Sequence, residues 1–376
     1  MAALTTLPNE LLDHILSHLS TDPPPSSRNF RELPSHSLTA SSDAPLKNIS
    51  RVDKRCRALS LPRVFAHSRY ELRYQTQFLD FLRQNDLGRH VKTVVVSVRT
   101  VYRGTETPRW WKELLHELDP LSVTVIAPPY IFADMADTTL YQKDGWAFNL
   151  PLQMMQFRQP AWDKPHPRVL EPNEHDTFLN ARPWTALSFN EGSSLSAYST
   201  YEYFLLRVPS LMDTWGQSLS SPPATPQSAI TPFIALARLT SFHYTAIFPF
   251  YNHTNLVLKL LRTMTSLRSF ALQLSPGPGS TILDEESARS SALDANDPWM
   301  ELETSYALVA HTVKYLGVQG PLQEFQTLDY AAHILREIID RKLGRVLSEK
   351  WAHDGEGFWK KRPVSASVNS QDGDAG

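Results

Sequence analysis

The chain has 376 residues, of which 41% are hydrophobic and 20% charged, and its formal net charge is -2. This composition supplies a sizeable core and excludes a disordered chain, and the small net charge favours neither nucleic acid nor membrane as a partner. Cys56 is the only cysteine, which excludes an intrachain disulfide and a cysteine-based metal site.

The location that we expect is cytoplasmic and/or nuclear. The N-terminus lacks the basic segment and apolar run of a signal peptide, and no stretch of 18 apolar residues predicts a membrane span. The basic cluster Lys360-Lys361-Arg362-Pro363 resembles a nuclear signal, but so short a cluster is more often a solvated tail.

The first strong pattern is a short amphipathic helix over residues 7 to 19. Pro8 suits the first helical position, where its missing N–H is unpaired anyway, and Glu10 falls where the helix dipole favours a carboxylate. The apolar residues at helical spacing are Leu11, Leu12, Ile15, Leu16 and Leu19. The pattern predicts one wide apolar face on this helix.

Residues 21 to 45 interrupt the helical pattern. They contain Pro23-Pro24-Pro25 and many serines, so they predict an exposed, largely disordered insertion. A second helix is predicted from Leu46 to Leu61, with Pro62 ending or kinking it. Its apolar positions alternate with a basic run that continues to Arg73.

Strands and helices then alternate along the chain. Residues 76–85 and 110–118 predict helices, and residues 91–98 and 121–126 predict strands rich in β-branched side chains. Residues 299–316 and 331–351 predict further helices, and residues 363–376 a frayed tail.

Related segments recur along the chain at irregular offsets. Residues 93–96 resemble 123–126 at an offset of 30, and residues 239–244 resemble 267–272 at an offset of 28. The segment 322–328 follows 55 residues later, about two such periods. Leucine-rich repeats have periods of roughly 20–29 residues, so the pattern favours an irregular strand–helix solenoid, with an ordinary α/β domain as the alternative.

The N-terminal pattern resembles the F-box family, whose signature starts with Leu-Pro, then Glu-Leu and an Ile/Leu pair. A Val, a Cys and basic residues follow in a second helix; here Val52, Cys56, Arg55 and Arg57 match. The insertion at 21–45 and the residues Asp53 and Lys54 depart from the usual pattern. Members of this family bind a Skp-type adaptor, which links them to a cullin scaffold.

The resemblance implies an α+β or α/β chain in which a three-helix F-box (1–70) precedes a leucine-rich-repeat-like region (71–362) that recruits an unidentified target. The chain would then be a non-catalytic substrate receptor of a ubiquitin ligase that needs no cofactor. The residues that the resemblance assigns to adaptor binding are Leu7, Pro8, Glu10, Leu11, Ile15, Leu16, Leu19, Ile49, Val52, Cys56 and Leu59.

Other functions have weaker support in the sequence. The histidines lack metal-ligand spacing, and neither a phosphate-binding loop nor a Gly-x-Ser-x-Gly elbow occurs, so an α/β enzyme is the least favoured reading. The basic run from Lys47 to Arg73 is more typical of a solvated helix face than of a DNA-binding surface. A scaffold outside any ligase, with a degenerate F-box, is the second hypothesis. The aromatic residues weighed as a core or an interface are Trp184, Tyr198, Tyr201, Tyr203, Phe204 and Trp215.

Overall fold

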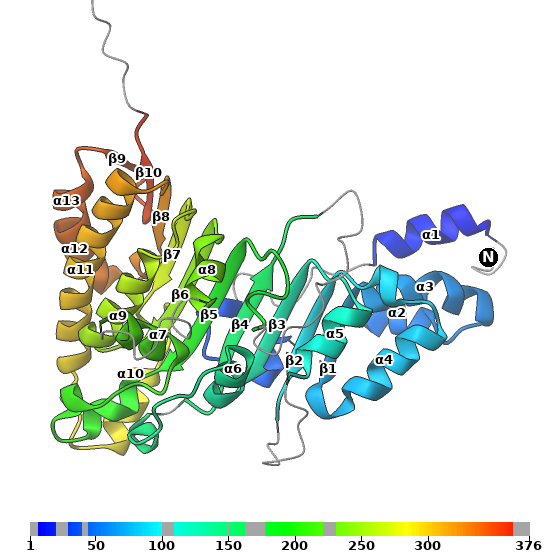
Figure 1. The fold of residues 1–376 in the computed structure, drawn as a ribbon, viewed down its shortest axis with the longest axis horizontal. Helices are drawn as coiled ribbons and strands as arrows, with labels where there is room; N and C mark the ends of the chain where they lie inside the picture. Colours follow the sequence, from blue (N-terminus) through cyan, green and yellow to red (C-terminus); the bar gives the residue numbers. More distant parts are fainter. Residues whose placement is uncertain are drawn as a thin grey trace, which may run out of the picture.

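The computed structural model describes residues 7–19, 29–39, 44–99, 109–148, 150–161, 177–220 and 231–363. It is a mixed α/β structure built on one ten-stranded, mostly parallel sheet (Figure 1). The strands are β1 (His67–Glu71), β2 (Thr93–Ser97), β3 (Ser122–Ala127), β4 (Gln153–Arg158), β5 (Ala186–Ser193), β6 (Ser241–Ile247), β7 (Ser269–Gln273), β8 (Glu324–Thr327), β9 (Trp351–His353) and β10 (Phe358–Lys361). The helices are α1 (Asn9–Ser17), α2 (Ala44–Ile49), α3 (Lys54–Ala66), α4 (Gln75–Gln84), α5 (Trp111–Glu117), α6 (Pro129–Met135), α7 (Leu211–Ser220), α8 (Thr231–Ala237), α9 (Tyr251–Leu261), α10 (Ile282–Arg289), α11 (Asp297–Gln319), α12 (His333–Ile339) and α13 (Arg345–Leu347).

Neighbouring strands follow the order of the chain from β1 to β8, and β10 and β9 complete the sheet. The strands β1 to β3 are parallel, as are β5 to β8, whereas β4 is antiparallel to both of its neighbours. The hairpin β9–β10 is antiparallel and joins the sheet at β8. Helices therefore connect most pairs of successive strands as crossovers, so that these strands start at the same end of the sheet.

The sequence offsets correspond to strand registers. Phe242 of β6 lies opposite Phe270 of β7, which confirms the offset of 28. Phe270 lies opposite Phe325 of β8, so the offset of 55 is also a register. The expectation of two periods there is wrong, because one long crossover with α10 and α11 fills residues 274–323 without a strand. Between β2 and β3 the register is 29, with Val94 opposite Val123, so the expected offset of 30 is wrong by one residue.

Helices cover one face of the sheet, and the main hydrophobic core lies between them and the strands (Figure 1). Aromatic side chains at matching positions of β6, β7, β8 and β10 stack in a row. The ring centroids of Phe270 lie 6.1 Å from Phe242 and 5.5 Å from Phe325, and Phe325 lies 5.6 Å from Trp359. Such cross-strand pairs help to fix the register at this end of the sheet.

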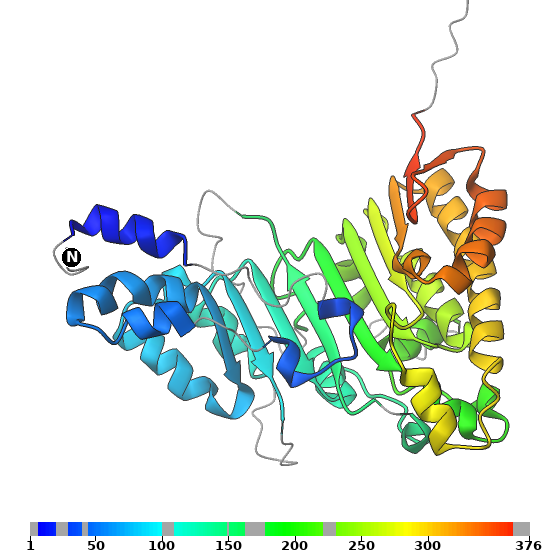
Figure 2. The same ribbon diagram turned by 180° about the vertical axis from the view of Figure 1, so that it is seen from behind.

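The opposite face carries residues 29–39, which we call the strap, and we name this side of the sheet the strap face (Figure 2). Phe30 of the strap is 2% exposed and packs against Val95, Ile126 and Met154. The prediction of a disordered insertion is therefore wrong for residues 29–39. Residues 21–28 and 40–43 of the predicted insertion lie outside the described residues. Its last two residues belong to α2, which begins at Ala44.

The predicted helix from Leu46 to Leu61 is two helices. Asp53 ends the turn between them, because its carboxylate accepts a hydrogen bond of 2.6 Å from the backbone N–H of Cys56 and so caps α3. The same bond lowers the pKa of Asp53. Pro62 neither ends nor begins a helix but lies inside α3, four residues before its end.

Two other expectations change at the C-terminal end. The helix predicted over residues 331–351 is interrupted by a π-helical turn, Asp340–Gly344, and is followed by β9. The basic cluster Lys360–Lys361–Arg362 begins in β10 rather than in a tail, and the Lys361 ammonium donates to the carbonyl of Gly317. Residues 364–376 of the predicted tail lie outside the described residues. The expected boundary at residue 70 falls within β1.

Candidate functional site

The helices α1, α2 and α3 form a small unit at the β1 end of the sheet (Figure 1). Leu12 and Leu16 of α1 are each 2% exposed, and neither belongs to the hydrophobic clusters of the sheet. Arg63 of α3 forms a 2.9 Å ion pair with Asp13 of α1. Part of the predicted basic run therefore holds α1 against α3 and is not a free basic surface.

Two apolar side chains of α1 point away from this unit. Leu11 is 51% exposed and Ile15 is 38% exposed, although both lie on a helix whose other apolar side is already buried. Val52, in the turn between α2 and α3, is 59% exposed. We call Leu11 and Ile15 the α1 apolar surface. This surface is one helical turn long. It lies on the outside of the molecule, where a second chain has access to it.

The residues assigned to adaptor binding separate into three classes by exposure. Pro8, Glu10, Leu11, Ile15 and Val52 are exposed, and Leu7, Leu19, Ile49 and Leu59 are half-buried. Leu16 and Cys56 are buried, at 2% and 1% exposure. These two support the packing inside the unit and do not form a contact surface. Burial raises the pKa of the Cys56 thiol, and the carboxylate of Asp53 adds to that shift.

A second candidate site lies on the strap face, where sheet side chains bind the main chain of the strap. The Asn190 amide donates to the carbonyls of Phe30 and Glu32, both at 2.8 Å, and the Gln273 amide donates to the carbonyl of Arg31 at 3.1 Å. Asn190 is 0% exposed and Gln273 is 3% exposed. The strap thus covers buried amides of β5 and β7 that lie far from it in sequence.

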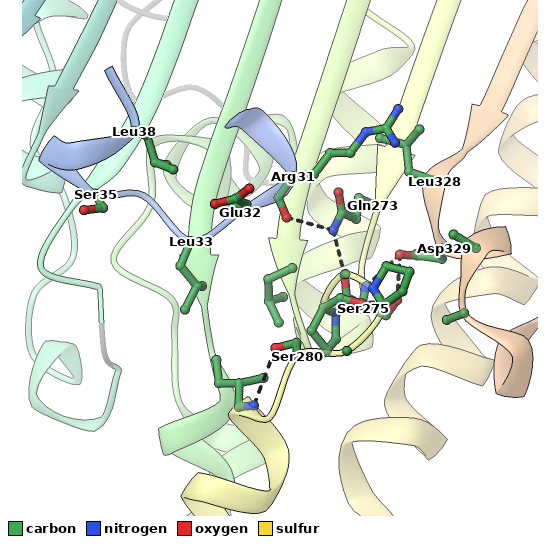
Figure 3. Close-up of a pocket in the computed structure, with 18 of the residues that line it drawn as sticks. Arg31, Glu32, Leu33, Ser35, Leu38, Gln273, Ser275, Ser280, Leu328 and Asp329 are labelled. Atoms are coloured by element: carbon green, nitrogen blue, oxygen red, sulfur yellow. Dashed lines mark hydrogen bonds between the residues drawn. The ribbon is translucent and has the colours of Figure 1, made fainter. Parts of the chain in front are cut away.

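A cavity of about 760 Å³ lies beside the strap (Figure 3). One wall is the strap, with Arg31, Glu32 and Leu33, and the other is the loop from Ser275 to Ser280 with residues of 328–332. Asp329 at its rim has no capacity left for a ligand, because it accepts hydrogen bonds from the N–H groups of Leu274 and Ser275 and from two hydroxyls. Burial raises the pKa of Asp329, although these hydrogen bonds act to lower it.

The helix side of the sheet holds a buried cluster of polar groups. The Glu191 carboxylate binds the His253 ring at 2.6 Å and accepts hydrogen bonds from the hydroxyls of Tyr244 and Ser210. Burial opposes protonation of His253, but Glu191 and, more weakly, Asp213 outweigh it and raise its pKa. This cluster ties β5, β6, α7 and α9 together.

The buried cluster lacks the arrangement of a hydrolase. The Ser210 hydroxyl donates to Glu191 and accepts the backbone N–H groups of Met212 and Asp213, so it caps the start of α7. No hydrogen bond joins it to His253 among the described residues. A nucleophile needs a base within hydrogen-bond reach, and we assign the cluster a structural role.

Sequence reasoning found α1 but missed the strap face. The amides of Asn190 and Gln273 carry no local signal, because their partners lie 160 and 242 residues away along the chain. The aromatic group is also divided: Trp184, Tyr198 and Trp215 are buried, whereas Tyr201 and Phe204 are 89% and 53% exposed. Most of this aromatic group therefore belongs to the hydrophobic core, whereas Tyr201 and Phe204 face solvent.

No protein-family model matches the chain, and no curated protein or solved structure matches it. Within the described ranges, no three His, Cys, Asp or Glu side chains are grouped to hold a metal ion. None of the helices in those ranges is long and apolar enough to cross a bilayer.

Proposed function

We propose that the chain is a substrate receptor of a cullin-based ubiquitin ligase, and that α1–α3 form an F-box-like unit that binds a Skp-type adaptor. The observation that carries this proposal is the α1 apolar surface. Leu11 and Ile15 stay exposed although Leu12 and Leu16 already attach α1 to α3. An apolar patch on an isolated end of a molecule is typical of a protein–protein contact.

The remainder of the chain would recruit the target. Parallel strands that follow the chain order, with helices on one face, support an irregular leucine-rich-repeat-like array. The antiparallel strand β4 would interrupt such an array in its middle. The receptor would act by proximity, since holding a target near a charged conjugating enzyme raises its effective concentration. No catalytic residue or cofactor of this chain is needed for that.

The test is capture of a purified Skp-type adaptor by the full chain. The double variant Leu11→Asp with Ile15→Asp should weaken binding at least about 100-fold, because two carboxylates would be buried in an apolar contact. The matched control is Val318→Asp with Ile334→Asp, which changes side chains that are 48% and 61% exposed elsewhere. The control should bind as the wild type does.

Two results would count against the proposal. Equal binding by wild type and the α1 double variant would refute the docking surface. A wild-type chain that does not bind the adaptor, but binds other partners through the sheet region, would favour the scaffold hypothesis.

A further inference from the structure

The sheet side chains Asn190 and Gln273 bind the strap through its main chain. Three consecutive carbonyls, those of Phe30, Arg31 and Glu32, accept hydrogen bonds from the amides of Asn190 and Gln273. Every residue type carries such a carbonyl, so these bonds would form with other sequences. Main-chain hydrogen bonds combined with side-chain pockets are a recurring mode of peptide recognition.

The amide of Asn190 is oriented by the sheet itself. Its side-chain oxygen accepts the backbone N–H of Gly192 at 2.9 Å, which leaves the amide nitrogen directed to the strap. Gly192 has a φ of +82° at an irregularity of β5, and an added Cβ there would lie 3.1 Å from Leu150 and 3.7 Å from Pro34. The backbone of β5 therefore fixes the donor and lets the strap approach closely.

One side chain of the strap provides the apolar anchor. Phe30 is 2% exposed and contacts Val95, Ile126 and Met154, and its ring centroid lies 6.2 Å from that of His243. Within the same segment Leu33 is 44% exposed beside the cavity. A fully buried aromatic residue is typical of the residue that contributes most of the binding energy in a contact.

One cationic side chain of the strap, Arg31, acts on the same buried ring as a cationic side chain of the sheet. Arg31 extends over the sheet (Figure 3) and, like Arg158, lies close enough to His243 to oppose its protonation. Neither arginine forms an ion pair among the described residues. Arg31 and Arg158 thus act with the same sign on the His243 ring, and an acidic residue in place of Arg31 would be attracted to Arg158.

We propose that the strap face is a peptide-binding site, that residues 29–39 are its intramolecular ligand, and that a partner segment with an aromatic residue followed directly by an acidic residue displaces them. The aromatic residue replaces Phe30, the acidic residue replaces Arg31 and is attracted to Arg158, and the carbonyls of these two residues and of the next one accept hydrogen bonds from Asn190 and Gln273. This site does not depend on adaptor binding by α1, and its test contains no adaptor.

The first test uses a labelled peptide with the sequence of residues 27–41 and the change Arg31→Glu. The full chain with Phe30→Ser should bind it on the order of 100-fold more tightly than wild type, because its own strap has lost the anchor. Adding Asn190→Ala to this variant should abolish the gain. The peptide with arginine at position 31 should bind more weakly, and high salt should remove that difference.

The second test keeps the wild-type strap sequence almost intact. Ser37 is exposed and the only cysteine, Cys56, is buried, so Ser37→Cys allows a fluorophore to be attached to the strap alone. Saturating Arg31→Glu peptide should change its emission, and the same peptide with Phe30→Ala should not. Absence of any emission change, or a folded Phe30→Ser chain that binds no better than wild type, would overturn the proposal.

Discussion

Acidification should destabilise the protein through His243 of the strap face. Burial, with smaller effects from Arg31 and Arg158, lowers the pKa of His243 from 6.5 to about 4. The folded state therefore binds this proton less readily than the unfolded state does. Stability is retained above pH 6.5, falls as the pH decreases from 6.5 towards 4, and levels off below that.

The size of this effect follows from the two pKa values. A shift of this magnitude corresponds to roughly 2.5 kcal/mol of unfolding free energy lost between pH 7.5 and pH 4.5. His243→Gln removes the titrating group. The loss of stability between these two pH values should therefore be smaller in the variant than in the wild type by about that amount.

The assay is urea unfolding of both proteins at pH 7.5 and pH 4.5, compared as a double difference so that other titrating groups cancel. His311→Gln changes an exposed histidine and is the matched control, which should behave as the wild type. An equal loss of stability in wild type and His243→Gln would refute the reasoning, because it would mean that His243 is protonated in the folded state as readily as in the unfolded one.

Two further predictions concern packing and pH on the helix side. Gly317→Ala in α11 should destabilise the protein by about 1–3 kcal/mol in thermal unfolding, because the added Cβ would lie 2.5 Å from Trp351. The control Gly344→Ala should not destabilise it, because no atom lies within 4 Å of the added Cβ there. Equal unfolding midpoints of the two variants would contradict this prediction. His253 should have the opposite pH dependence to His243, because its pKa is raised. The difference in unfolding free energy between wild type and His253→Gln should favour wild type below pH 6.5 and should disappear as the pH rises through the pKa of His253 in the folded state. A difference that does not change with pH would refute this prediction.

Local patterns predicted those elements whose two faces differ in polarity or whose side chains are β-branched. The helix α4 and the strands β2 and β3 lie where the sequence places them. Strand β1 was missed, because its residues alternate between buried and half-buried positions and include polar ones on the strap face. The turn before α3 was also missed, since a single capping carboxylate, Asp53, creates it within a continuous helical pattern.

The candidate site was predicted only in part for a related reason. The spacing of Leu11, Leu12, Ile15 and Leu16 predicts one apolar face but does not say which of these residues α3 covers. Packing decided that Leu12 and Leu16 turn inwards and that Leu11 and Ile15 stay exposed. Burial depends on the position of a second helix, which the spacing of the first cannot specify.

The sequence by itself determined the strands β2 and β3, the offset between β6 and β7 and the amphipathic N-terminal helix, because each of these depends on a local pattern of residues. The tertiary structure alone decided that residues 29–39 cross the sheet. That segment reads as a polar, proline-flanked loop, and its partners Asn190 and Gln273 become neighbours only when β5 and β7 have joined the sheet. Contacts over such sequence distances leave no local periodicity, so only the assembled sheet reveals them.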